Sequence, residues 1–227
     1  MNGMTGGNAD ALRVKVWDWP TRVFHWGLLL CLVGLWYTST EFMLFRWHKW
    51  LGYTVLGLLL FRIVWGFVGS ETARFSNWLA GPVTVARYAW GRLRGTAPEY
   101  LGHNPLGGWA ILLMLALLLV QAVTGLFAND DIFNKGPLAD SVSRDVERAM
   151  TRAHKANFDL LLIVIGVHVL AVFTYQFILR IRLIGAMITG YKRGAWSDHP
   201  HIANPWFGLV LALVVAALVF GVGSAWG

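Results

Sequence analysis

The chain has 227 residues, of which 56% are hydrophobic and only 14% are charged. A soluble domain carries roughly 25% charged residues, so this composition excludes an ordinary soluble enzyme and indicates a membrane protein that crosses the bilayer several times. The formal net charge is +7, but the basic residues flank the apolar runs instead of forming one patch, which argues against a nucleic-acid-binding protein.

Five apolar segments are each long enough to cross the bilayer as a helix. The residues before them, 1–14, begin with a stretch rich in Gly and Asn and are predicted to be a disordered N-terminal tail. The expected spans, with edges uncertain by a few residues, are about 21–40, 48–69, 107–128, 154–180 and 205–226.

The distribution of Lys and Arg predicts the orientation of the spans. Eleven of these residues lie in the N-terminal tail and in the second and fourth loops, whereas six lie in the first and third loops. Because cytoplasmic loops are enriched in Lys and Arg, we expect a cytoplasmic N-terminus and, after five spans, a C-terminus outside.

Four histidines inside or at the mouth of these spans are the candidate functional residues. His154 and His168 are 14 residues apart on one predicted helix, which places them about 21 Å apart along its axis and on nearly the same face. Since alternate spans run in opposite directions, His25 matches the depth of His168, and His48 matches the depth of His154. Two stacked pairs of facing imidazoles suit two six-coordinate haem irons, one near each leaflet.

Other interpretations of membrane histidines fit this pattern less well. A single histidine is as readily explained by a hydrogen bond to a neighbouring helix as by ligation, but four at two matched depths are not. A proton relay normally recruits carboxylates, and the predicted spans contain only Asp159. A zinc or copper site is weaker still, because each depth offers only two histidines. We therefore expect an all-α integral membrane protein that holds haem between its helices.

Several stretches resemble the bacterial cytochrome b561 family, particularly the branch of b-type cytochrome subunits of nickel–iron hydrogenases. The matching stretches are VWDWPTRVFHW (16–26), HKWLGYTVLGLLLFRIVWGFVGS (48–70), GHNPLGGW (102–109), His154, His168 and GAMITGYK (185–192). The resemblance implies a dihaem cytochrome b domain over 15–193, with two haem b groups whose axial ligands are His25, His48, His154 and His168. It also implies that the first four spans form a four-helix haem-binding bundle. Residues 194–227, a predicted cytoplasmic loop and the fifth span, depart from the four-helix members of the family as one additional C-terminal transmembrane helix.

Two further polar residues attract attention. Arg62 lies 14 residues after His48, so it should face the bundle near the inner haem. There it is predicted to contact a haem propionate or a quinone carbonyl, although an arginine that extends to the cytoplasmic interface remains an alternative. His103 precedes Asn104 and Pro105 and is interpreted as a turn residue rather than a ligand.

These features favour an electron conduit in the bacterial inner membrane. The family resemblance implies a periplasmic redox partner, either a c-type cytochrome or a hydrogenase-like enzyme, and a lipid quinone at the other end; it leaves a bound quinone and a homo-oligomer open. The acidic loop at 129–147 suggests that the partner is basic. Two alternatives stay open: a stand-alone oxidoreductase acting on a small redox substrate such as superoxide or a ferric chelate, and a non-redox transporter or anchor.

Overall fold

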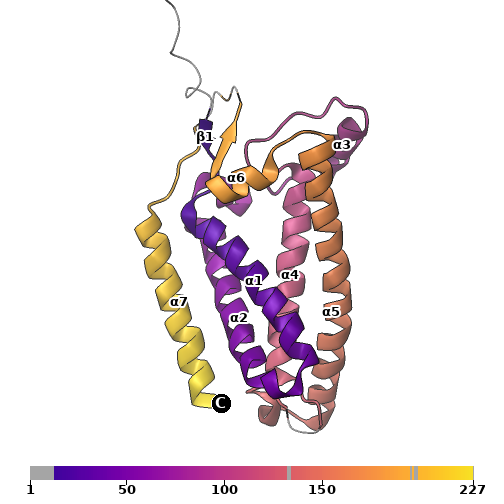
Figure 1. The fold of residues 1–227 in the computed structure, drawn as a ribbon, viewed down its shortest axis with the longest axis vertical. Coiled ribbons are helices and arrows are strands. Elements are labelled where there is room, and N and C mark those ends of the chain that lie inside the picture. The colour runs from indigo at the N-terminus through magenta and orange to yellow at the C-terminus, as the bar shows by residue number, and fades with distance from the viewer. Residues whose placement is uncertain (1–12, 132–133, 195, 197–198, 227) are drawn as a thin grey trace, which may run out of the picture.

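Four long helices form the body of the protein, as a computed structural model shows. The structure describes residues 13–131, 134–194, 196 and 199–226. Successive long helices run in opposite directions in one bundle (Figure 1), and all four are long and apolar enough to cross a membrane. They are α1 (Trp19–Thr40), α2 (Phe45–Val68), α4 (Pro105–Phe127) and α5 (Arg144–Phe173).

Polar residues just before two of these helices define where they begin. The side chain of Asp18 accepts a hydrogen bond from the backbone N–H of Thr21 at 2.7 Å and caps α1. Asn104 caps α4 in the same way through Gly107, also at 2.7 Å. A proline follows in the first turn of each helix, where its missing N–H costs nothing.

Helix α5 is longer than the sequence predicted. It begins at Arg144 instead of near His154, because Ser143 caps it and two carboxylates in its first turn complement the helix dipole. It continues into a π-helical turn, η5 (Thr174–Ile178). His154 therefore lies well inside a helix that extends beyond the apolar segment.

Short elements gather at the end of the bundle opposite the C-terminus (Figure 1), which we call the inner end. Strands β1 (Arg13–Lys15) and β2 (Tyr191–Arg193) pair antiparallel, with Val14 opposite Lys192. The prediction that the tail extends to residue 14 is therefore wrong for Arg13 and Val14, which lie in β1; Val14 is buried, and its side chain holds the strand in place. Residues 1–12 lie outside the described part of the chain.

The short elements at the inner end are β1 (Arg13–Lys15), α3 (Pro82–Leu93), α6 (Leu183–Thr189) and β2 (Tyr191–Arg193), with the 3₁₀ turns η2 (Glu71–Ala73) and η3 (Phe75–Asn77). Two more 3₁₀ turns, η1 (Phe42–Leu44) and η4 (Ala139–Ser141), lie in the first and third loops.

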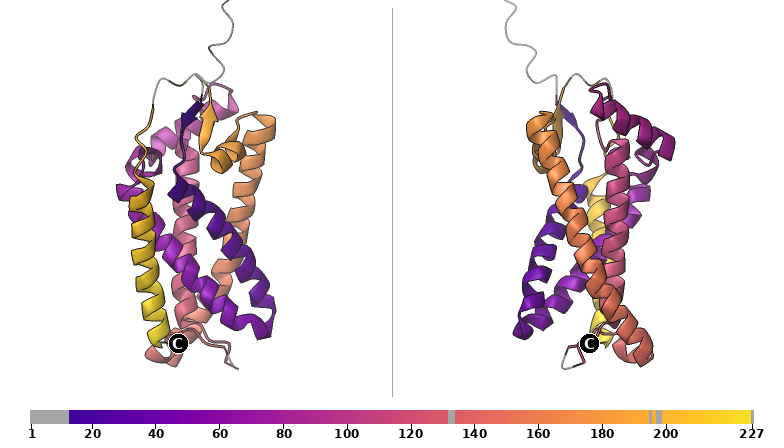
Figure 2. Two further views of the ribbon diagram at one scale, coloured as in Figure 1. Left: turned by 60° about the vertical axis from the view of Figure 1, so that its left-hand side comes forward. Right: turned by 90° about the vertical axis from the view of Figure 1, so that its right-hand side faces the viewer.

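The segment predicted as a fifth span is helix α7 (Pro205–Trp226), which lies along α2 on the outside of the four-helix bundle (Figures 1 and 2). The contact of α7 with the bundle is close, because a Cβ on Gly208 would lie 2.5 Å from Pro20 of α1 and one on Gly223 would lie 3.1 Å from Tyr53 of α2. The apolar part of α7 that is described with its side chains is Pro205–Gly221. It is shorter than the four spans. That α7 crosses the membrane remains a prediction.

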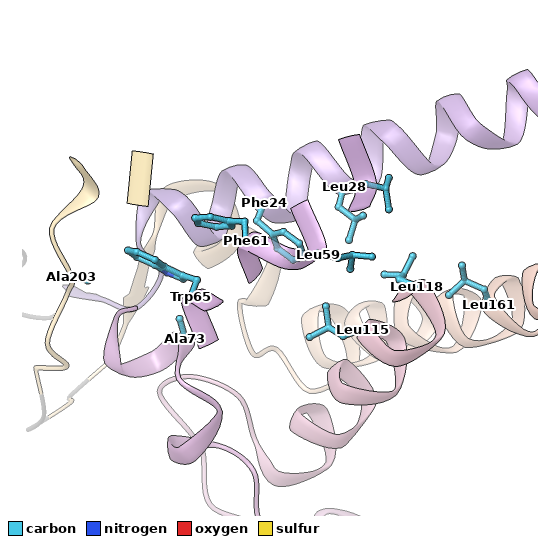
Figure 3. Packing of buried hydrophobic residues seen from close by; sticks show 11 residues of the cluster. Phe24, Leu28, Leu59, Phe61, Trp65, Ala73, Leu115, Leu118, Leu161 and Ala203 are labelled. Carbon is cyan, nitrogen blue, oxygen red and sulfur yellow. The ribbon is translucent and has the colours of Figure 1, made fainter. Parts of the chain in front are cut away.

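A layer of leucines fills the middle of the bundle (Figure 3). It takes Leu28 from α1, Leu59 from α2, Leu118 from α4 and Leu161 from α5. Leu59 and Leu161 are 0% and 2% exposed, so this layer is closely packed. Leu161 lies seven residues from both His154 and His168, which places the layer midway between them.

Candidate functional site

The four histidines extend from three helices and come together in two pairs. His48 of α2 lies within electrostatic range of His154 of α5, and His25 of α1 lies within range of His168 of α5. We call His48 and His154 the outer pair, and His25 and His168 the inner pair, after the orientation that the charge distribution predicts. All four side chains are half-buried.

A threonine fixes the orientation of His48 in the outer pair. The hydroxyl of Thr38 donates to the carbonyl of Gly34 at 2.8 Å, so its oxygen is left to accept from His48 Nδ1 at 3.1 Å. The proton of this imidazole is therefore on Nδ1, and Nε2 carries a free lone pair.

The same arrangement recurs at His154 with residues of α4. The hydroxyl of Thr124 donates to Val120, and its oxygen lies 3.2 Å from His154 Nδ1, which also lies 3.0 Å from the carbonyl oxygen of Gln121. The amide of Gln121 accepts from Asn157 through Oε1 at 2.7 Å, so its NH₂ group faces His154 Nε2 at 3.2 Å. His154 Nε2 is thus an acceptor, and its lone pair is the one that an iron would use.

A cavity of about 730 Å³ adjoins the outer pair and is lined by both of its histidines. This volume falls within the range of about 300–1,000 Å³ typical of cofactor sites. Gly125 lies against His154, and a Cβ there would lie 3.0 Å from the imidazole Cε1. The walls are largely apolar, with Leu118, Leu161 and Ile165 among them. The outer pair thus places two imidazoles beside an apolar cavity, and an iron there would take the place of the Gln121 amide at His154 Nε2. This arrangement fits a haem.

The inner pair has different surroundings. His25 Nδ1 is buried without a hydrogen-bond partner, and in the described part of the chain His168 makes no hydrogen bond either. The ring of Trp26 meets His25 edge-on at 5.0 Å. Within the described ranges, no three His, Cys, Asp or Glu side chains gather where they could hold a metal ion, so each pair offers two imidazoles alone.

Arg62 and His103 both lie near the inner pair. Arg62 is only 3% exposed, and its guanidinium bonds to the carbonyl of Ala73 in the loop that follows α2. His103, interpreted from sequence as a turn residue, has a buried Nδ1 and lies within electrostatic range of Arg62, His168 and His25. Burial and the charge of Arg62 lower the pKa of His103 to about 3, so its imidazole is neutral.

Helix α3 is anchored to the C-terminal end of α5 by two tyrosines and an arginine. The hydroxyl groups of Tyr88 and Tyr175 lie 3.2 Å apart, and Arg92 Nη2 donates to Tyr88 at 2.8 Å. Burial and the hydrogen bond to Tyr175 raise the pKa of Tyr88 to about 12. This contact positions α3 at the inner end.

Ion pairs join acidic and basic residues in the third loop and at the start of α5. Arg144 lies 3.5 Å from Asp131 and 3.0 Å from Glu147, and Lys135 pairs with Asp140. These ion pairs leave the net charge of the loop unchanged, and the basic partner stays a prediction.

One family model matches this chain, that of prokaryotic cytochrome b561, over residues 16–190. The match covers every long helix except α7 and includes all four histidines of the two pairs. None of the curated proteins compared with the chain matches it.

Proposed function

Because the chain belongs to the prokaryotic cytochrome b561 family, and is thus a multi-pass membrane b-type cytochrome of electron transfer, we propose that it holds two haems and carries electrons across the membrane. The observation that carries the proposal is the presence of two histidine pairs, each of which takes one imidazole from α5. His154 and His168 lie about 21 Å apart along the helix axis, comparable with the hydrocarbon thickness of about 30 Å.

We assign His25 and His168 as the axial ligands of an inner haem, and His48 and His154 as those of an outer haem. When bound, haem supplies a one-electron change between ferric and ferrous iron. The chain orients the outer imidazoles through Thr38 and the Gln121 carbonyl, which keep the proton on Nδ1. The leucine layer lies between the two pairs and gives the space there apolar walls. Arg62 is the further residue that we place against a cofactor.

The partners at the two ends follow from the same proposal. We place the chain in the bacterial inner membrane with its N-terminus in the cytoplasm, on the charge distribution described above. A periplasmic redox protein, either a c-type cytochrome or a hydrogenase-like enzyme, then exchanges electrons with the outer haem, and a lipid quinone is the other redox partner.

Vesicles that contain the purified protein test the transmembrane step. Ferricyanide is enclosed inside them, a membrane-impermeant reductant is added outside, and the loss of ferricyanide absorbance is followed. The variants are His154→Ala and His168→Ala, and His199→Ala is the control, because His199 is an exposed loop residue outside both pairs. We expect ferricyanide reduction to be at least tenfold slower in either ligand variant and unchanged in the control.

Two results would contradict this function. If both ligand variants reduced ferricyanide at the wild-type rate, electrons would not pass through the two pairs. If the haem-loaded wild type moved no electrons across the vesicle membrane but reacted with superoxide or a ferric chelate from one side, the chain would be a stand-alone oxidoreductase.

A further inference from the structure

Arg62 is a buried cation whose hydrogen-bonding capacity is largely unused. Its Nη2 donates to the carbonyl of Ala73 at 3.2 Å, and the guanidinium lies 5.1 Å from the centre of the Phe75 ring. Its Nη1 is buried and has no hydrogen-bond partner among the residues that the structure describes. A buried charge is costly unless it is paired and hydrogen-bonded, so this side chain lacks a partner.

Asp18 does not fill that role. It interacts with Arg62 electrostatically, but among the described residues no carboxylate lies within ion-pair distance of the guanidinium. Both oxygens of Asp18 are already bonded, Oδ1 to Thr21 N–H at 2.7 Å and Oδ2 to Trp65 Nε1 at 3.0 Å. Asp18 is therefore committed to the start of α1.

His103 offers a second unused polar atom in the same place. Its ring lies between those of Trp17 and Trp78, with centroid distances of 4.7 and 5.1 Å. Trp78 shares the carbonyl of Ala73 with Arg62, so the imidazole and the guanidinium belong to one connected cluster. His103 Nδ1 is buried and has no hydrogen-bond partner within the described part of the chain.

We propose that Arg62 and His103 together form a carboxylate-binding pocket that holds a propionate of the inner haem. The inference rests on the proposed function, because it requires a haem between His25 and His168, both of which lie within electrostatic range of His103. A carboxylate would accept from Arg62 Nη1 and from a protonated Nδ1 of His103, and its charge would compensate the buried guanidinium. His103 is thus a fifth functional histidine, one that positions the cofactor without ligating iron.

Infrared difference spectroscopy of the haem-loaded protein tests this pocket directly. Cells supplied with 5-aminolevulinate labelled with ¹³C at its carboxyl group place the label in the haem propionates. Redox difference spectra of labelled and unlabelled protein then separate propionate bands from those of other carboxylates. The variants are Arg62→Gln and His103→Phe, and the latter keeps a ring between the two tryptophans. Arg74→Gln is the matched control, since Arg74 is a nearby half-buried arginine bonded to Gly69 instead.

We expect one label-sensitive carboxylate band to shift in both variants and to stay in place in the control. Arg62→Lys retains the positive charge and should shift the band less. It replaces Arg62→Gln as the test variant if the glutamine variant does not fold and accumulate in cells. The pocket is overturned if the label-sensitive bands are the same in every variant, or if the band that moves is insensitive to the label and so belongs to another carboxylate. Absence of an inner haem in the wild type would instead overturn the proposed function.

Discussion

The outer and inner histidine pairs have the same plan but different surroundings. Each takes one imidazole from α5 and one from a neighbouring helix. In the outer pair both Nδ1 atoms have hydrogen-bond partners, which are Thr38 Oγ1 for His48 and the Gln121 carbonyl for His154. In the inner pair His25 Nδ1 has none, and a buried arginine lies nearby instead.

This difference has a consequence for the redox potentials of the two haems that we propose. An imidazole that donates its second N–H to an oxygen becomes a more basic ligand and stabilises ferric iron. The outer haem should therefore have the lower midpoint potential, so that electrons pass downhill from the outer pair to the inner pair. Four changes would break or sharpen this comparison.

Removal of one ligand should have the largest effect. His48→Ala is expected to eliminate the lower-potential haem, and His25→Ala the higher-potential one, because the two pairs share no histidine. Redox titration of the visible spectrum separates the two components. Loss of both haems in either variant would mean that the pairs do not bind independently.

A smaller but still site-specific loss is expected from Gly125→Val. Since a Cβ alone would lie 3.0 Å from His154 Cε1, the added side chain should displace the imidazole and lower the retention of the outer haem severalfold. Gly166→Val on α5 is the control, because a Cβ there meets nothing within 4 Å. The haem content per chain measures the effect, and equal losses in the two variants would count against the close contact.

Removal of a threonine hydroxyl should change the outer potential without loss of haem. If the bond from His48 Nδ1 to Thr38 contributes about 1 kcal/mol to the ferric state, Thr38→Val should raise the outer midpoint by roughly 20–40 mV. Thr54→Val controls for the substitution, since Thr54 is half-buried and, among the described residues, its hydroxyl bonds only to the backbone of its own helix. A shift of the inner component, or an equal shift in the control, would refute the assignment.

The smallest effect belongs to the third loop. Asp140→Asn breaks an exposed ion pair with Lys135, and such pairs contribute about 0–1 kcal/mol. We expect less than a twofold change in electron transfer from a cationic donor such as a basic c-type cytochrome, measured by stopped flow. A much larger loss would identify this loop as a docking surface.

The parts of the fold that depend on local sequence were predictable. The lengths of the apolar runs predicted the four long helices. The spacing of His154 and His168 on one helix predicted histidine pairs at two depths in the membrane. Asn104 followed by Pro105 marked the start of α4, as the structure confirms. Each of these features lies within a few helical turns of chain.

Features that depend on distant packing could not be predicted. His103 is enclosed by Trp17 and Trp78, which come from segments far away in sequence, so its neighbourhood has no periodic signal. The partners of the outer imidazoles, Thr38 and Gln121, look like ordinary helix residues until α1 packs against α2 and α4 packs against α5. Strand β1 likewise exists only because β2 returns to it after the whole bundle.

The ratio of haem to protein in the purified chain, measured with His154→Ala and His168→Ala alongside the wild type, tests the central claim most directly. We expect about two low-spin b haems per wild-type chain and about one in each variant, with the lower-potential component missing from His154→Ala and the higher-potential component missing from His168→Ala. A single haem that both variants retain, or no haem at all, would contradict the assignment of two pairs.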